Sequence, residues 1–559
     1  MRKNRISRSN HYILSFMLLM IVIGCAPQKE IIKADLVLVN GQIWTGNKQL
    51  PAATALAVKA DTFLMVGDNN SVKPLIGPET RIVDGGNYSV LPGFIDTHVH
   101  FLEGGFRLSS VLLRTARTPE EFISRIKAYA DQATEGEWIT GGDWDHEQWG
   151  GELPVRQWID SVSPNNPVWV NRLDGHMSLA NSLALKLAGV TSETADIKGG
   201  TIVRDQQGMP TGIFKDNATV LIDKVVPDQS PAQKNTALKK AMDYVSAQGV
   251  TSVHSVGSWG DLEVYEQAHQ NRELTTRIYA GVPLSSWQRL EEKIDQSGQG
   301  DDQLRVGLLK GFVDGSLGSH TAAFFEPFDD DPDNKGLMVN SEQDLYQWTK
   351  NADQAGLQVA IHAIGDRANH VLLNIYEKVI DEDGEKDRRF RIEHAQHLQK
   401  EDIPRFSKLG IIPCMQPYHA IDDGRWAEKV IGDRIQTTYA FKDLFESGAK
   451  VAFGSDWFVA PPTPLEGIYA AVTRRTLDGK NPEGWVPEQK ITLDQALEAY
   501  TINAAYASFE EDKKGSIEVG KLADFVLLSD DLFYIPPEYI KDLMVLMTVV
   551  GGRVVYELR

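Results

Sequence analysis

The feature that most constrains the fold is a series of eight short apolar runs, most of which end in a polar residue. They span residues 90–96, 250–254, 277–281, 306–310, 357–362, 391–394, 411–416 and 451–456. Helix-compatible stretches, such as 261–271 and 341–355, separate several of them. Strands that alternate with helices favour a parallel sheet, and eight such units predict an α/β fold of the (β/α)₈ TIM-barrel type. A doubly wound open sheet is the alternative, but no glycine-rich phosphate-binding motif follows the first run.

Short β-type runs near both ends predict a second domain. They cover residues 35–40, 42–45, 55–58, 63–67 and 81–84, and then 523–528, 545–550 and 553–556. Gly, Asn, Asp and Pro separate them, as in hairpin-forming strands. We therefore expect one composite β-sandwich built from residues 25–89 and 515–559.

The barrel is then expected to span residues 90–490, with a last barrel helix at 491–514. Thr492 and Gln495 have the spacing of a capping box that opens this helix. The interval 101–249 between the first two barrel strands is far longer than one crossover helix requires. It predicts an inserted subdomain over the barrel mouth.

The first 25 residues have the pattern of an export signal. Four basic residues precede a short apolar run at 12–23, which is shorter than the ~20 residues of a membrane span. The sequence Val-Ile-Gly-Cys at 22–25 resembles a bacterial lipobox, which implies a lipoprotein-type signal peptide over 1–24 and lipid attachment at Cys25. An uncleaved anchor is the alternative. We expect an exported, membrane-anchored lipoprotein, at the periplasmic face of the outer membrane if the cell is Gram-negative.

The charge and cysteine content exclude several partners and scaffolds. A total of 57 Lys and Arg against 77 Asp and Glu gives a net charge of −20, which argues against nucleic acid as a partner. Two cysteines cannot build a disulfide scaffold. We expect a small-molecule substrate, and the sequence leaves a homo-oligomer open.

Two histidines at the end of the first barrel run form the sharpest local motif. In an extended strand, His98 and His100 point to the same face and can bind one metal ion, although two hydrogen-bonded structural histidines are the alternative. His362, His394 and Asp456 also fall at the C-terminal ends of predicted strands, where barrel active sites form. Imidazole and carboxylate ligands suit zinc or a similar ion. The pattern therefore predicts a joint metal site.

Lys310 ends an apolar run and is expected in the barrel mouth beside the metal ligands. Burial and nearby cations would lower the pKa of its ammonium group. The neutral amine can react with carbon dioxide to give a carbamate, an anion able to bridge two metals. A lysine that points outward to an acidic partner is the alternative. Cys414 is expected to be a buried small apolar residue rather than a nucleophile.

Further residues are weaker candidates for substrate contacts, and each could equally pack the structure around it. They are Trp144, Asp145, His176, Asp314 and His419. Trp144 or His176, in the insertion, could close the mouth over a substrate.

Five segments together resemble the amidohydrolase superfamily, specifically the YtcJ-like branch, amidohydrolase family 3. They are PGFIDTHVH at 92–100, LKGFVDGSLGS at 309–319, IHAIGD at 361–366, RIEHAQ at 391–396 and GSDW at 454–457. The resemblance covers essentially the whole mature chain, including GKLAD at 520–524. It implies a metal-dependent hydrolase on a (β/α)₈ barrel with a composite β-sandwich, and two divalent metal ions, with zinc as the expected element.

The resemblance also implies a role for each matching residue. His98, His100 and Asp456 would hold one ion, His362 and His394 the other, and carboxylated Lys310 would bridge them. A metal-bridging hydroxide would attack the substrate carbonyl, and Asp456 would pass a proton to the departing nitrogen. His320 stands where an arginine is common in the family, and it is the corresponding candidate for a substrate contact.

The leading functional hypothesis is hydrolysis of a non-peptide carbon–nitrogen bond in an amide, cyclic amide or N-acyl compound. A lactonase or other ester hydrolase could use the same hydroxide. A lipid-anchored binding protein without catalysis is the alternative from another class, but a pure binder has no need of a bridging lysine and a proton-shuttling aspartate. The substrate itself depends on loop shape, which fold-level similarity does not settle.

Overall fold

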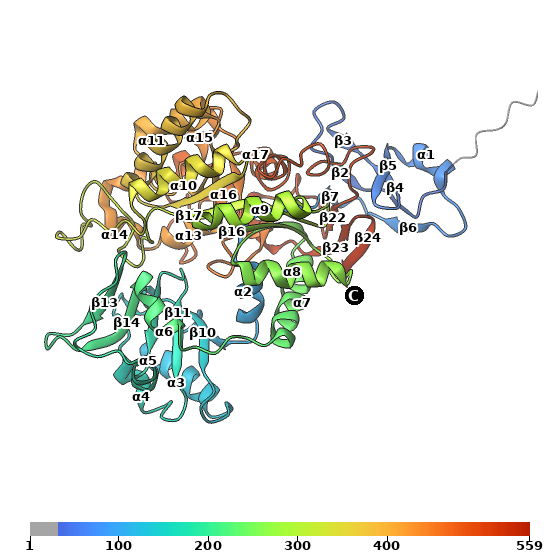
Figure 1. Ribbon diagram of the computed structural model, residues 1–559. Helices are drawn as coiled ribbons and strands as arrows, with labels where there is room; N and C mark the ends of the chain where they lie inside the picture. The colour runs from blue at the N-terminus through green and yellow to red at the C-terminus, as the bar shows by residue number, and fades with distance from the viewer. Residues whose placement is uncertain (1–31, 559) are drawn as a thin grey trace, which may run out of the picture.

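A closed parallel barrel forms the centre of the structure, a computed structural model that describes residues 32–558 (Figure 1). Its strands lie side by side in the order β8 (Phe94–Val99), β15 (Val250–Val256), β16 (Arg277–Pro283), β17 (Leu304–Phe312), β18 (Gln358–Ala363), β19 (Arg391–His394), β20 (Ile412–Met415) and β21 (Ala452–Phe453). A parallel bridge between Val99 and Trp457 links the outermost strands and closes the ring. All eight predicted runs are strands of this one sheet, which confirms the (β/α)₈ barrel. Cys25 and the predicted signal peptide lie outside the described residues.

The barrel strands are buried on both faces, which explains why they appear in the sequence as continuous apolar runs rather than alternating ones. β15, β18 and β20 are buried at every position. Helices cover the outside of the ring: α7 (Pro231–Ala247), α8 (Trp259–Gln270), α9 (Trp287–Ser297), α10 (Glu342–Gln354), α11 (Asp366–Asp383), α12 (Ile403–Leu409), α16 (Pro464–Thr473) and α17 (Leu493–Tyr500). Thr492 and Gln495 form the predicted capping box at the start of α17.

A buried carboxylate joins the two strands at which the ring closes. Oδ1 of Asp96 in β8 accepts hydrogen bonds from the backbone N–H groups of His98 (3.2 Å) and Ser455 (2.9 Å), and Ser455 follows β21. The strands approach closely here, since a Cβ atom on Gly454 would lie 2.7 Å from the backbone nitrogen of His98. Asp96 and Gly454 therefore fix the register of β8 against the segment that carries Asp456.

The β domain consists of two sheets packed face to face, drawn mainly in blue and red in Figure 1. The strands of the first sheet lie in the order β5 (Thr62–Gly67), β4 (Ala55–Lys59), β1 (Leu36–Val39) and β6 (Arg81–Asp84). The strands of the second sheet lie in the order β24 (Arg553–Glu557), β23 (Val545–Val550), β22 (Phe525–Leu528), β7 (Ser89–Pro92), β2 (Gln42–Trp44) and β3 (Ala52–Ala53). β22 pairs antiparallel with β7, so strands from opposite ends of the chain share one sheet. The rings of Phe63 and Phe525 lie 6.3 Å apart in the common core, as expected for a composite sandwich.

The long interval between β8 and β15 contains its own sheet (Figure 1, teal). The strand order is β13 (Gly200–Arg204), β14 (Pro210–Asp216), β12 (Met177–Ala180), β11 (Val168–Arg172), β10 (Ile139–Trp144), β9 (Val111–Leu112). α2 (Phe101–Arg107) precedes this insertion, and α7 leads back to the barrel. The predicted insertion after the first barrel strand is therefore present, and it has a separate hydrophobic core.

Across residues 32–558, the helices are all too short or too polar to span a lipid bilayer.

Candidate active site

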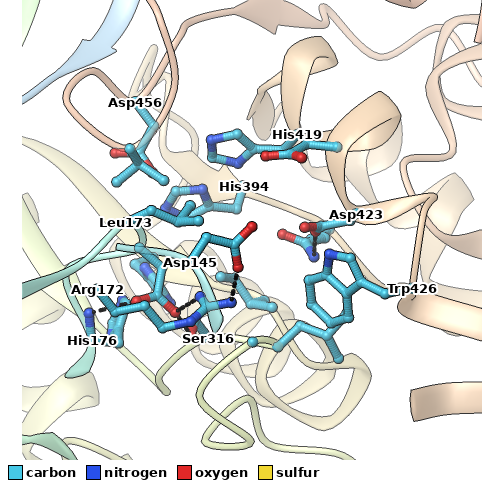
Figure 2. A pocket seen from close by; sticks show the side chains of 18 of the residues that line it. Asp145, Arg172, Leu173, His176, Ser316, His394, His419, Asp423, Trp426 and Asp456 are labelled. Carbon is cyan, nitrogen blue, oxygen red and sulfur yellow. Dashed lines mark hydrogen bonds and ion pairs between the residues drawn. The ribbon is translucent and has the colours of Figure 1, made fainter. Parts of the chain in front are cut away.

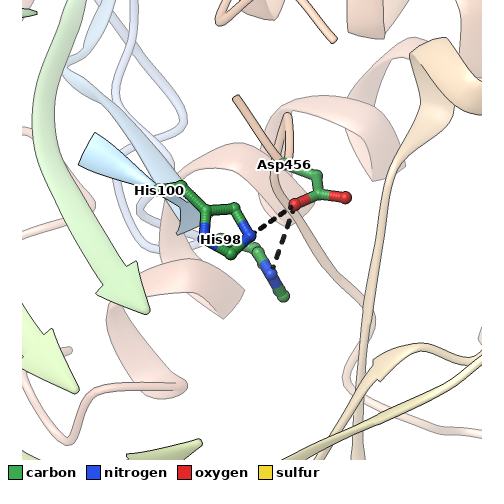
Figure 3. Close-up of side chains that lie close together, drawn as sticks. All are labelled: His98, His100 and Asp456. Carbon is green, nitrogen blue, oxygen red and sulfur yellow. Dashed lines mark ion pairs between the residues drawn. The ribbon is translucent and has the colours of Figure 1, made fainter. Parts of the chain in front are cut away.

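The predicted metal ligands gather where barrel strands end. His98 lies in β8 and His100 follows it, while Asp456 comes shortly after β21. Oδ1 of Asp456 lies 3.4 Å from Nε2 of His98 and 3.3 Å from Nε2 of His100 (Figure 3). The two imidazoles therefore converge on one carboxylate oxygen, as the i, i+2 spacing predicts.

The remaining predicted ligands lie beside this group. His362 in β18 and His394 in β19 have ring centroids 4.5 Å apart, and the ring of His394 lies 5.0 Å from that of His98. Nζ of Lys310 in β17 lies 3.1 Å from Nε2 of His98. All six residues that the sequence singled out as metal ligands are thus in one cluster.

The charge states in this cluster suit metal binding. Burial lowers the pKa of His98 to about 4 and holds that of His394 well below its ordinary value, so both rings are neutral near pH 7. Although burial opposes it, the neighbouring His98 and the close contact with His100 hold the pKa of Asp456 well below its usual range. Neutral imidazoles and an ionised carboxylate are the forms that bind a metal ion.

The carboxylate of Asp456 also lacks the partner that a buried oxygen requires. Its Oδ1 is buried and accepts no hydrogen bond from the described residues. An unpaired buried carboxylate oxygen is costly. A cation held between Asp456, His98 and His100 would satisfy it, so the donor set fits a metal ion.

Glu393 fixes the orientation of His98 from behind, and it was not among the residues predicted from the sequence. Its Oε2 contacts Nδ1 of His98, and its Oε1 accepts a 2.8 Å bond from Nε of Arg391. Although burial alone would raise it, Arg391 and His98 lower the pKa of Glu393 to about 2. The signal that identifies this pair is the spacing of Arg391 and Glu393, two residues apart on one face of β19.

Lys310 is buried close to an aromatic ring, where water does not solvate its ammonium group. Its Nζ lies 4.8 Å from the centroid of Phe312. Burial lowers the pKa of Lys310 to about 8, so in a fraction of the molecules this side chain is a neutral amine near neutral pH.

Burial also raises the pKa of Cys414 to about 12, which leaves this thiol unreactive.

A narrow cavity of about 50 Å³ opens beside the ligand cluster (Figure 2). His362, His394 and Asp456 form one part of its lining. The insertion and the segment after β20 contribute many of the other lining residues, among them Asp145, Arg172, Asp174, His176, His419, Asp422, Asp423, Arg425 and Trp426. The insertion therefore supplies part of the active-site wall.

Three of the weaker candidates line this cavity: Asp145, His176 and His419. Nδ1 of His176 lies 2.7 Å from Oδ1 of Asp216, and this contact helps to raise the pKa of His176 against the opposing effect of burial. Nε2 of His419 is buried without a hydrogen-bond partner among the described residues. The ring of His419 is nearly parallel to that of His394, with centroids 6.4 Å apart.

The other weaker candidates have different surroundings and are absent from the cavity lining. Trp144 packs in the core of the insertion and donates a 2.9 Å hydrogen bond to the carbonyl of Val170. The carboxylate of Asp314 accepts hydrogen bonds from the backbone N–H groups of residues 323, 364 and 365. Nε2 of His320 lies 3.0 Å from Asp330. These contacts give all three side chains structural partners.

The charged residues of the cavity wall, above all Arg172, Asp423 and Arg425, were not predicted from the sequence. Arg172 ends β11 and Asp174 lies just beyond it, and the polar run at 171–176 that contains both was the available signal in the insertion. Asp423 ends α13 (Pro417–Asp423), and no local pattern marks it.

Comparison with known proteins agrees with this architecture. Residues 81–556 match the model of the amidohydrolase family. The chain is 42% identical over 541 residues to the protein LONG AFTER FAR-RED 3 of Arabidopsis thaliana, covering 94% of this chain and 92% of that protein. It is 32% identical to the putative amidohydrolase YtcJ of Bacillus subtilis, over 93% of this chain and 98% of that one.

Two further similarities involve a named enzyme and a solved structure. The N-substituted formamide deformylase of Arthrobacter pascens is 28% identical, over 94% of this chain and 98% of that enzyme. The crystal structure of a metal-dependent hydrolase from Pyrococcus horikoshii superposes with a TM-score of 0.72 at 28% identity, over 93% of this chain and all of that one. With its barrel and its cluster of histidine and aspartate ligands, the chain belongs to the amidohydrolase family and is a metal-dependent hydrolase, an enzyme that acts on carbon–nitrogen bonds.

Proposed function

We propose that this enzyme hydrolyses a non-peptide carbon–nitrogen bond in a small amide, cyclic amide or N-acyl compound, using two divalent metal ions, with zinc as the expected element. The full-length similarity to an enzyme whose name specifies N-substituted formamides supports this class of substrate. The narrow cavity beside the ligand cluster favours a small substrate over a folded polypeptide.

The observation that carries the proposal is the position of Asp456. Its buried, unpaired Oδ1 lies within 3.4 Å of Nε2 of both His98 and His100, where a cation would satisfy all three groups. We assign one ion to these three residues and the second to His362 and His394. Bound divalent ions lower the pKa of water and polarise a substrate carbonyl, which makes hydrolysis feasible near neutral pH.

The side chain of Asp456 would then carry the proton released by the attacking water. Asp456 is ionised, lines the cavity and points at the ligand cluster, so its carboxylate can accept the proton of the attacking water. Returning that proton to the departing nitrogen completes the cleavage and releases a neutral amine. The insertion, through Asp145, Arg172 and Asp174, narrows the cavity and restricts bulk water.

Lys310 is proposed to bridge the two ions as a carbamate. Its neutral amine would add to carbon dioxide to form a C–N bond and release one proton, which converts the neutral side chain into an anion. Two observations support this step: the lowered pKa of Lys310 and the 3.1 Å separation of its Nζ from Nε2 of His98. An anion at this position would offset the repulsion between two neighbouring cations.

The test is a metal-loaded activity screen with elemental analysis. The protein, stripped and reloaded with zinc, is assayed on N-acyl amino acids, N-substituted formamides, cyclic ureas and matched esters and lactones. We expect bound metal and turnover of at least one amide class, with turnover lost in Asp456→Asn. Faster turnover of esters than of matched amides would favour a lactonase, and metal-free protein with no turnover would favour a binding protein.

We also propose that the chain is an exported lipoprotein anchored to the membrane through Cys25. The basic residues, the short apolar run and the lipobox-like Val-Ile-Gly-Cys support this localisation.

A further inference from the structure

The cavity wall away from the metal-ligand candidates is crowded with charged groups. It contains the carboxylates of Asp145, Asp174, Asp422 and Asp423 and the guanidinium groups of Arg172 and Arg425. Carboxylates outnumber guanidinium groups, so the balance of charge at this wall is negative. Figure 2 shows Asp145 and Arg172 on one side of the cavity and Asp423 beside the Trp426 indole on another.

Both arginines of this wall already have carboxylate partners. Arg172 lies 2.7 Å from Asp174 and 3.5 Å from Asp145, and its Nε donates a 3.2 Å hydrogen bond to His146. Arg425 pairs with Asp422 and lies 3.4 Å from Asp145. Both guanidinium groups therefore already serve carboxylates of the protein.

Asp423 is in the opposite situation, because it forms no ion pair with any residue in the described range 32–558. Its Oδ2 accepts hydrogen bonds from the hydroxyl of Tyr439 (2.6 Å) and from Nε2 of Gln396 (3.1 Å). Burial raises the pKa of Asp423 to about 7, because Arg172 and Arg425, which do not pair with it directly, offset only part of the cost of burying its charge.

A second unpaired group lines the same cavity beside the metal-ligand cluster, because one ligand atom each of His419, His394 and Asp456 lies within 4.8 Å of the others. Nε2 of His419 is buried and has no hydrogen-bond partner among the described side chains and backbone. His419 and Asp423 both belong to α13, so one short helix presents an unpartnered nitrogen and a carboxylate without a direct ion pair to one space.

We propose that Asp423 is the counter-ion for a cationic N–H group of the substrate, so that the substrate carries a primary ammonium or amidinium group in addition to the bond that is cleaved. This inference rests on the proposed hydrolysis of a small amide and specifies its substrate class. The ammonium would donate to the Asp423 carboxylate, and the aromatic face of Trp426 beside it suits a cation. A substrate with a carboxylate at the same position would meet Asp423, Asp422 and Asp145 and be repelled.

The first experiment measures binding, so that it does not depend on turnover. Zinc-loaded protein is titrated calorimetrically with the N-methanesulfonyl derivatives of 1,4-diaminobutane (mono-substituted), pentylamine and 5-aminopentanoate, named below by their parent amines. The uncleavable sulfonamide replaces the basic amine that all three share, so only the diamine derivative carries an ammonium group, while the others end in a methyl group or a carboxylate. We expect the diamine to bind about tenfold or more tightly than the other two, the effect of one charge-assisted hydrogen bond. Equal binding of the three amines, or tighter binding of 5-aminopentanoate, would overturn the proposal.

The variant Asp423→Asn keeps the acceptor for Tyr439 and Gln396 but removes the charge. We expect it to lose the preference for the diamine while its affinity for pentylamine stays unchanged. Asp542→Asn, at an exposed position, is the matched control and should keep the preference. An equal loss of affinity for all three amines in Asp423→Asn would mean that Asp423 only supports the wall, and would contradict the proposal.

A second variant separates charge from structure. Tyr439→Phe removes the hydrogen bond to Asp423 but leaves its carboxylate in the cavity, so the diamine preference should survive. Its disappearance would show that the hydrogen-bonded wall, rather than the Asp423 charge, selects the ligand.

Turnover then separates this inference from the proposed function. The N-acetyl derivatives of the same three amines (monoacetylated for the diamine) are assayed with zinc-loaded enzyme, and the derivative with the free ammonium should have the highest kcat/KM. If no amide is hydrolysed but the diamine preference in binding holds, the proposed function fails and the ammonium subsite stands. If all three derivatives are hydrolysed equally well, the subsite fails and the function stands.

Discussion

Glu393 contacts Nδ1 of His98 on the side of the ring away from the cavity, and this contact decides which nitrogen faces Asp456. The pKa of Glu393 is lowered to about 2, so its carboxylate is ionised and can only accept a hydrogen bond. Nδ1 of His98 must therefore carry the hydrogen, which leaves the lone pair on Nε2, toward Lys310 and Asp456. A carboxylate that holds a metal-ligating histidine in this way tunes both its orientation and its basicity.

Replacing Glu393 with Gln should therefore weaken metal binding without removing a ligand. We expect zinc affinity to fall about 10- to 100-fold, the usual effect of losing such a supporting carboxylate. Competition with a coloured chelator measures this change. Glu385→Gln, at an exposed position, is the control, and equal zinc affinity in the two variants would contradict the role of Glu393.

Removing both histidines of β8 should abolish the site that they share with Asp456. The double variant His98→Ala, His100→Ala loses two imidazole ligands from one ion, so elemental analysis should find at most one equivalent of metal. His269→Ala, at the end of α8 beside Asp301, is the control and should keep both. Two equivalents in the double variant would rule out the assignment.

Substitution of Lys310 tests the carbamate. Lys310→Ala should abolish turnover and lower metal occupancy, because the two cations would lose a shared anionic ligand. A short-chain carboxylic acid should restore part of the activity by filling the gap, whereas Lys310→Arg should not respond, since its guanidinium stays charged and fills the space. Electron density for a bare amine more than about 4 Å from any metal, compared with the ~2 Å of a ligand contact, would disprove bridging.

The metal-free protein should lose stability in mild acid. His98 takes up a proton near pH 6.5 in the unfolded chain but only near pH 4 in the folded one, because burial lowers its pKa. Between these values the unfolded state binds more protons, so the free energy of unfolding falls as the pH drops, by on the order of 3 kcal/mol for this residue. Urea unfolding at a series of pH values measures the loss, and His98→Asn should reduce it. A free energy of unfolding that is unchanged between pH 6.5 and pH 4 would argue against a neutral His98.

The lipid anchor is tested by a single substitution in the segment before residue 32. Cys25→Ser should yield protein that is unprocessed or soluble, because no thiol remains at the lipobox position to accept diacylglycerol. Mass spectrometry of the purified protein checks the modification. Detection of diacylglycerol on the serine variant would refute the interpretation of residues 22–25.

The sequence predicted the barrel and its six candidate ligands because both depend on local patterns. Each barrel strand is buried on both faces and therefore appears as an apolar run, and parallel strands bring their C-terminal ends to one edge. His98, His362, His394 and Asp456 lie at or just beyond such ends, so knowing the strands was enough to bring these side chains together.

The cavity wall could not be predicted in the same way, because it depends on how separate segments pack. Arg172 from the insertion and Arg425 from the segment after α13 are distant in sequence, yet both lie against Asp145. The surroundings of Trp144 and Asp314 depend on packing in the same way: their residue types suit a binding site, and the fold supplies a distant carbonyl and three distant backbone amides as their hydrogen-bond partners. Which polar group is left unpaired is a property of the whole fold.

Asp96 accepts hydrogen bonds from His98 and from Ser455, which is 359 residues away in the chain. The same contact between residues 96–98 and Ser455 therefore helps both to close the ring of strands and to complete the first metal-binding group. A chain that has not yet been synthesised as far as residue 456 has neither a closed ring nor a complete set of ligands. Uptake of the ion at this group thus reports that synthesis has passed residue 456, and shorter nascent chains remain inactive.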